Sequence, residues 1–149
     1  MAVISWGKCT IKYKGEDDSS FVALPIPVDG STSLETTEGE RMEAKEEGGG
    51  IVDVIVKSPE MSLVFDLYLK KPESGQNFEV PLEPHDGQVE GEYAIELIPE
   101  DAACPGIKID RARVTTAPQF SSSEGLRMRY TCTALKPTSG DMVKIQVIS

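Results

Sequence analysis

The feature that most constrains the fold is a two-residue alternation of apolar and polar side chains along most of the chain. In residues 126–134, Leu126, Met128 and Tyr130 alternate with Arg127 and Arg129. Successive side chains of a β-strand leave opposite faces of the sheet, so this period predicts a strand with one buried face. The same pattern predicts further strands within residues 8–14, 63–70, 92–97 and 143–147.

One run differs from this pattern because it is almost continuously apolar. Residues 51–56 read IVDVIV, which is rich in β-branched side chains. A run of this kind is typical of a strand that lies inside the protein and has both faces covered. We therefore expect residues 51–56 to be buried on most of both faces.

Turn signals separate the expected strands and leave little room for helices. Asp29-Gly30, Asp86-Gly87 and Ser139-Gly140 supply positions for tight turns. Short helical turns fit only within residues 74–83 or 99–104. The chain of 149 residues is thus predicted to be a single, mainly β domain spanning residues 1–149. Its expected fold is an antiparallel β-sandwich or barrel with at most one short helix and a long extended arm.

Residues 29–50 do not fit a compact sandwich and are expected to form that arm. They contain seven acidic and two basic residues, which is half of the net charge of −10. Long segments of this kind within a domain are functional or disordered. Residues 38–40 could turn a two-stranded ribbon with limbs at 33–37 and 41–45, and such a ribbon becomes stable when it pairs with another molecule. The alternative is a flexible, solvated acidic loop. The candidate interface residues of the arm are Leu34, Glu35, Glu38, Glu40, Arg41, Met42, Glu43, Glu46 and Glu47.

Charge is also distributed unevenly along the chain. Residues 1–100 hold 21 acidic and 8 basic residues, whereas residues 101–149 hold 4 acidic and 7 basic residues. An acidic arm at one end and a basic surface at the other would attract copies head to tail, which produces rings or open stacks. Alternatively, the arginines only lie on the solvent-exposed face of a strand and have no binding role. The candidate basic stacking face consists of Arg111, Arg113, Arg127 and Arg129.

The sequence contains no recognisable catalytic, metal-binding or cofactor-binding motif. His85 is the single histidine and lies in a Pro-His-Asp-Gly sequence, which predicts an exposed turn. Residues 48–50 are three glycines without the lysine and hydroxyl residue of a phosphate-binding loop, so we interpret them as a hinge where the arm returns to the body. Cys9, Cys104 and Cys132 are widely spaced and predict buried free thiols. We expect a protein that is not an enzyme and has no cofactor.

The sequence also argues against several partners and locations. A net charge of −10 opposes specific binding to nucleic acid, which requires a basic surface. No apolar stretch approaches the length needed to span a membrane. The first residues lack the apolar run of a secretion signal. These features predict a protein that is synthesised in the cytoplasm and has no membrane partner.

The order of these features resembles the tail tube (major tail) proteins of long-tailed bacteriophages and prophages. An N-terminal strand at residues 5–13 precedes a polar arm with a glycine-rich return at 30–50, followed by strands at 51–57 and 62–69 and a closing set of strands. The sequence YTCTALKP at residues 130–137, followed by Gly140, is also similar to prophage structural proteins. The resemblance implies a small β-sandwich or barrel with a flanking helix, six-membered rings that stack head to tail, and a long loop or hairpin that bridges subunits. It also implies a location in the virion tail after assembly.

An acidic wall suits a tube that conducts DNA, because it repels the phosphates of the passing duplex. The expected wall strands lie at residues 51–57 and 62–70, and Asp53 and Asp66 are the candidate lumen-facing residues. Two alternatives stay open. One is a β-sandwich binding module for cell surfaces or carbohydrates, with Trp6 as its aromatic platform. The other is a related tail component, such as a terminator or a piece of the baseplate hub.

Overall fold

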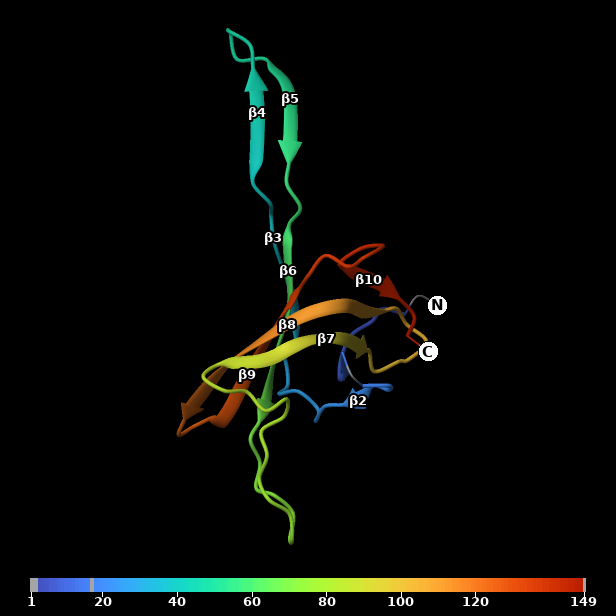
Figure 1. Cartoon of the computed structure of the whole chain (residues 1–149), viewed down its shortest axis with the longest axis vertical. Coiled ribbons are helices and arrows are strands. Elements are labelled where there is room, and N and C mark those ends of the chain that lie inside the picture. The colour runs from blue at the N-terminus through green and yellow to red at the C-terminus, as the bar shows by residue number, and fades with distance from the viewer. Residues whose placement is uncertain (1–2, 17, 149) are drawn as a thin grey trace.

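The computed structural model describes residues 3–16 and 18–148, and its regular elements are all β-strands (Figure 1). This confirms the mainly β fold expected from the alternation. Within the described residues there is no helix, so neither residues 74–83 nor 99–104 form the helical turns considered above. The strands are β1 (Thr10–Gly15), β2 (Val22–Ala23), β3 (Ser33–Thr37), β4 (Arg41–Lys45), β5 (Ile51–Val56), β6 (Glu60–Tyr68), β7 (Gln88–Ile98), β8 (Gly106–Ser121), β9 (Gly125–Ala134) and β10 (Val143–Gln146).

Eight of the strands form one antiparallel sheet, and β4 and β5 form a separate two-stranded sheet. The order in the large sheet is β2-β1-β7-β8-β9-β6-β3, and β10 pairs with the first residues of β8. The segment after β2 connects the two sides of this sheet. The amide of Leu24 donates to the carbonyl of Ile11 in β1, and the amide of Val28 donates to the carbonyl of Asp66 in β6. The large sheet therefore closes around a single interior and forms the body of the protein.

The core of the body follows the alternation of the sequence. In β6 the side chains of Leu63, Phe65 and Leu67 are fully buried, and in β9 those of Tyr130 and Cys132 are fully buried. The rings of Phe65 and Tyr130 stack with their centroids 5.3 Å apart. The hydroxyl of Tyr130 donates to the carbonyl of Pro81 at 2.7 Å, so the one polar atom of this ring is satisfied. Buried free thiols at Cys9, Cys104 and Cys132 are confirmed.

Two segments project from opposite ends of the body. Figure 1 shows β4 and β5 standing away from it at one end, and the loop between β6 and β7 hanging from the other. Strand β6 connects the two projections. It begins at Glu60, next to the β4–β5 ribbon, and ends at Tyr68, where the loop starts. Nine residues of strand span roughly 30 Å, so β6 sets the distance between the two projections.

Candidate subunit interface

The projecting ribbon of β4 and β5 is the upper part of one long hairpin. The lower part of this hairpin belongs to the large sheet and is formed by β3 and β6, in which Thr37 pairs with Glu60 and Ser33 pairs with Val64. In the upper part, Arg41 of β4 pairs with Val56 of β5. The turn at the tip spans Glu46–Gly50, where the amide of Glu46 donates to the carbonyl of Gly50 at 2.8 Å. The positive φ of 93° at both Gly48 and Gly49 explains the glycine run, because other residues rarely adopt that conformation.

The expected ribbon with limbs at 33–37 and 41–45 is therefore wrong. These two strands follow each other along one side of the hairpin and do not pair with each other. Residues 38–40 connect them without a reversal, and residues 48–50 are the tip of the ribbon instead of a hinge at the body. The reason is that β3 gains a place beside β6 in the large sheet, where Leu34 contacts the core.

The root of the ribbon is a close approach between two backbones. A side-chain carbon at Gly39 would collide with the carbonyl oxygen of Lys57, so only glycine fits there. Next to this contact the backbone amide of Lys57 donates to the carbonyl of Glu40 at 2.9 Å. The side chains of the same two residues form an ion pair, with Nζ of Lys57 2.9 Å from Oε2 of Glu40. The two limbs are thus joined immediately before β4 begins.

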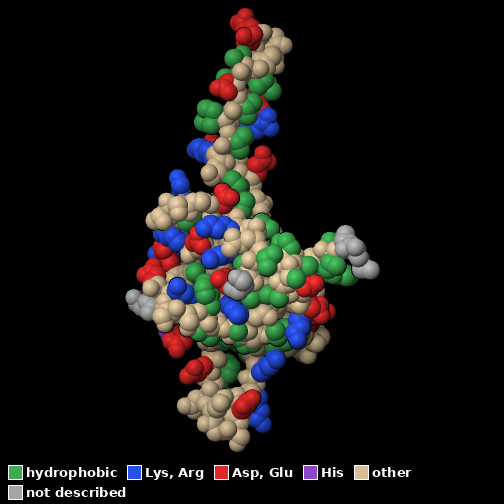
Figure 2. All heavy atoms as spheres, turned by 90° about the vertical axis from the view of Figure 1, so that its right-hand side faces the viewer, with side chains coloured by type: hydrophobic (Ala, Val, Ile, Leu, Met, Phe, Trp, Pro, Cys, Tyr) green, Lys and Arg blue, Asp and Glu red, His purple; other side chains and the backbone are tan. Residues whose placement is uncertain are grey.

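The two faces of the ribbon differ in chemistry. On one face Glu43 lies between two basic residues, with its carboxylate 2.9 Å from Nε of Arg41 and 3.6 Å from Nζ of Lys45. On this face Val56 and Val54 of β5 lie opposite Arg41 and Glu43. On the second face Met42 lies opposite Ile55 and Ala44 opposite Asp53, so that face is apolar apart from Asp53. Figure 2 shows apolar side chains along the whole projecting ribbon, between charged ones.

Strand β5 is exposed at every residue, and its expected burial is wrong. Ile51, Val52, Ile55 and Val56 are 53–60% exposed, and Val54 is 36% exposed. Both outer edges of the ribbon are also free of partners among the described residues. An exposed, apolar strand with an open edge is a liability for a monomer and a site where another chain can pair.

The candidate arm residues are divided among three locations. Leu34 and Glu35 belong to β3 and hence to the body, and Glu38 and Glu40 lie at the root. The others lie on the ribbon itself, with Arg41, Met42 and Glu43 in β4 and Glu46 and Glu47 at the tip. The projecting segment is therefore a ribbon of residues 41–56, and not the expected arm of residues 29–50.

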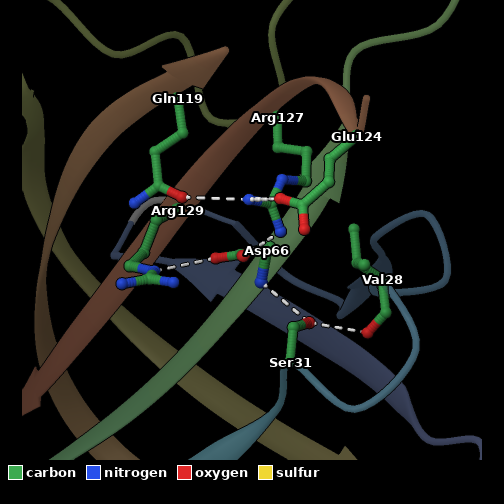
Figure 3. A network of polar contacts seen from close by, with 7 residues as sticks. All are labelled: Val28, Ser31, Asp66, Gln119, Glu124, Arg127 and Arg129. Carbon is green, nitrogen blue, oxygen red and sulfur yellow. Dashed lines mark hydrogen bonds and ion pairs between the residues drawn. The ribbon is translucent and has the colours of Figure 1, made fainter. Parts of the chain in front are cut away.

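Asp66 is the centre of a polar network on β6 and β9 (Figure 3). Its carboxylate accepts from Nη1 of Arg127 at 3.2 Å and from Nε of Arg129 at 3.0 Å. Its own amide donates to Oγ of Ser31 at 3.1 Å, and that hydroxyl donates to the carbonyl of Val28 at 2.7 Å. The network extends to Glu124, whose carboxylate lies 2.9 Å from Nη2 of Arg127. It ties the β8–β9 turn, β6 and the segment before β3 together.

This network corrects two expectations for these residues. Asp66 is only 2% exposed, so it does not face an open lumen as expected. Arg127 and Arg129 neutralise that buried carboxylate and do not form a free basic face; hydrogen bonding to Asp66 raises the pKa of Arg129. A buried carboxylate needs such partners because its desolvation is otherwise costly.

The other two arginines of the expected basic face lie on β8. Arg111 makes a two-pronged contact with the carboxylate of Glu92, at 2.9 Å and 2.8 Å, and Arg111 also donates to the carbonyl of Lys136. Hydrogen bonding to Arg111 lowers the pKa of Glu92. Arg113 is exposed on the same strand. The expected basic face is thus mostly compensated within the chain, because three of its four arginines have carboxylate partners.

Sequence reasoning missed the residues that make the ribbon unusual, namely the apolar side chains of β5. Their β-branched composition is the same for a central strand and for an exposed ribbon. The signal that distinguishes them is the neighbouring sequence: RMEAK and IVDVIV have nearly the same length and flank the turn sequence EEGGG. Asp53 lies on this ribbon, where its carboxylate accepts from the amide of Val54, and it is exposed.

The described residues, 3–16 and 18–148, contain neither a cluster of metal-ligating side chains nor a helix long enough to cross a membrane. His85 is exposed and forms an isolated bridge with Gln88, which confirms the expected turn. A scan against protein-family models finds no match, and a search of curated proteins finds no significant match.

Proposed function

We propose that this protein is a structural subunit that assembles with copies of itself into six-membered rings, which stack head to tail into a phage-type tail tube for DNA passage. The observation that carries this proposal is the ribbon of β4 and β5, which is hydrogen-bonded across its root and has an apolar strand with an exposed side chain at every position. Residues 41–56 contribute no side chain to the core of the body, which favours a role for the ribbon outside its own chain.

The energetics of the ribbon favour an assembly with many contacts over a single pair of molecules. Completing the burial of the five half-exposed apolar side chains of β5 would contribute about 4–8 kcal/mol. Association costs a comparable amount in lost translational and rotational freedom. One ribbon contact is therefore weak, whereas a ring and a stack combine several such contacts in one assembly.

The charge of the protein is compatible with a DNA conduit. The net charge is −10, and three of the four arginines expected to form a basic face are paired with carboxylates of the same chain. A surface of this kind repels phosphate and does not retain a passing duplex.

Electron microscopy of the purified protein at high concentration tests the proposal. We expect rings with six-fold symmetry and short stacks of them, and their number should increase with protein concentration. Particles that stay monomeric at millimolar concentration would contradict self-assembly. Closed dimers without rings would contradict the tube and leave a self-associating β protein. A terminator or hub component would give single rings without stacks.

A second candidate is a carbohydrate-binding module, and one observation favours it. The indole of Trp6 is 73% exposed and lines a hollow of about 250 Å³ together with Pro99 and Pro105. An exposed aromatic ring is a platform on which a sugar can stack. Binding to a glycan array that is lost in Trp6→Ala would support this function, and the absence of any glycan ligand would exclude it.

A further inference from the structure

We infer that the tip of the ribbon docks into the loop between β6 and β7 of a second copy of this chain, at the opposite end of the body. This inference rests on the proposed self-assembly and names the surface that receives the ribbon. The loop takes the place of the arginine surface expected from the sequence to attract the acidic arm, because the charges of those arginines are largely neutralised by Asp66 and Glu92.

The receiving loop is the second projection of the molecule. Its limbs are fixed to the body, because the amide of Leu69 donates to the carbonyl of Leu126 and the carbonyl of Pro81 accepts from Tyr130. Between these anchors every residue from 70 to 79 is exposed. The loop is thus held at both ends and presents its middle to the outside (Figure 1).

An open hollow of about 300 Å³ lies between this loop and the body. Its lining is mixed. The aromatic rings of Tyr68 and Phe78 are 44% and 50% exposed, and the other lining residues include Leu69, Pro72 and Pro81 beside the polar Lys70, Gln76, Asn77 and Glu79. Exposed aromatic rings around a hollow are typical of the central part of a protein interface. The hollow offers a matching surface for the apolar side chains near the tip of the ribbon, such as Ile51 and Val52.

Charge complementarity identifies a second copy as the partner. Lys70 and Lys71 are adjacent at the base of the loop, both are exposed, and neither makes an ion pair with another described residue. At the tip of the ribbon Glu46 and Glu47 are likewise adjacent, exposed and without an ion pair among the described residues. The loop also holds Glu73 and Glu79, so the complementarity resides in the lysine pair at its base.

The topology turns this contact into a stack. The ribbon and the loop leave the two ends of the same strand, β6, so they cannot reach each other within one molecule. A contact between two different surfaces repeats from copy to copy and gives a ring or an open stack, and surfaces at opposite ends of the long axis favour the stack. The contact therefore adds subunits along the long axis of the molecule.

A charge exchange between the two surfaces tests the inference. In low salt we expect Lys70→Glu/Lys71→Glu to raise the concentration needed for assembly roughly tenfold, because two attractive ion pairs become repulsive. Glu46→Lys/Glu47→Lys should do the same. The protein with all four substitutions has the net charge of the wild type and should assemble nearly as well as the wild type. Lys8→Glu/Lys136→Glu is the matched control, since it changes two exposed lysines elsewhere and should have a much smaller effect.

The outcomes separate this inference from the proposed function. If the wild type assembles but the four-fold variant is no better than either double variant, the receiving surface is wrong and self-assembly stands. The same holds if both double variants assemble like the control. If the wild type stays monomeric at millimolar concentration, both the receiving surface and the proposed function are overturned. Thermal unfolding of each variant shows that its body is folded.

Discussion

Glu40 and Lys57 join the two limbs of the ribbon by a backbone hydrogen bond of 2.9 Å and an ion pair of 2.9 Å. They lie where the sheet of the body ends and the exposed ribbon begins. An isolated two-stranded ribbon is marginally stable in water, so its conformation depends on how firmly its root is held. The root therefore determines whether the ribbon keeps a defined position relative to the body.

Gly39→Val should loosen the ribbon and leave the body intact. The new side chain would collide with the carbonyl oxygen of Lys57, and the limbs must separate to accommodate it. We expect amide hydrogen exchange in β4 and β5 to accelerate at least several-fold while exchange in β8 and β9 is unchanged. Gly50→Val is the matched control, because nothing lies near that position. Equal exchange rates in the two variants would contradict the role of Gly39.

Asp66→Asn should destabilise the body strongly. The substitution removes the buried negative charge that Arg127 and Arg129 neutralise. We expect a loss of about 3 kcal/mol in the free energy of unfolding, near the lower end for a broken buried ion pair because Arg129 is partly exposed. The melting temperature should fall by roughly 6–12 °C. The control is Asp53→Asn on the exposed ribbon, which should leave the melting temperature unchanged. A similar fall in melting temperature in both variants would refute the role of the network.

Cys132 should be the least reactive thiol of the folded protein at mild alkaline pH. Burial raises the pKa of its thiol to about 12 from an ordinary value of 9.0. The folded state therefore holds its proton where the unfolded state loses it. The stability from this group is complete below pH 9 and is lost as the pH rises toward about 12. Labelling with a thiol reagent at pH 8.5 should track global unfolding at Cys132, and fast labelling of the folded protein there would contradict its burial.

Met42→Thr/Ile55→Thr should weaken self-association without affecting the body. Both side chains lie on the apolar face of the ribbon, opposite each other across the strand pair, and Ile55 is 55% exposed. We expect the concentration needed for assembly to increase about tenfold, and the melting temperature to change little. Phe120→Thr, which removes a side chain that is 75% exposed on β8, is the control. An equal effect of this control would indicate non-specific adhesion instead of a ribbon contact.

The body of the protein could be predicted from the sequence because its strands have one buried and one wet face. The alternation within residues 63–70 and 126–134 correctly predicts strands with one buried face, which carries Phe65 and Leu67 in β6 and Tyr130 and Cys132 in β9. The outward side chains were harder to interpret. Arg127 and Asp66 both lie outside the apolar pattern, and only the register of β6 with β9 brings them together.

The ribbon could be predicted as a projection but not in its register. Residue composition marks 29–50 as unfit for a core, yet it does not show that β3 pairs with β6. The register of the hairpin is set by the pairing of residues 33–37 with residues 60–64, which lie far apart in the sequence. Likewise, the continuous apolar run of β5 predicts burial, but it does not show whether the strand is covered by its own chain or by another chain.

Sedimentation velocity of a ribbon-deleted protein tests the central claim most directly. Because Glu40 and Lys57 are already hydrogen-bonded, an Asn-Gly turn can replace residues 41–56 and close the hairpin at its root. At a concentration where we expect the wild type to form rings and stacks, we predict that the ribbon-deleted protein forms no stacks and keeps the thermal stability of the wild-type body. A ribbon-deleted protein that sediments as the same large assemblies would show that the ribbon does not join the subunits.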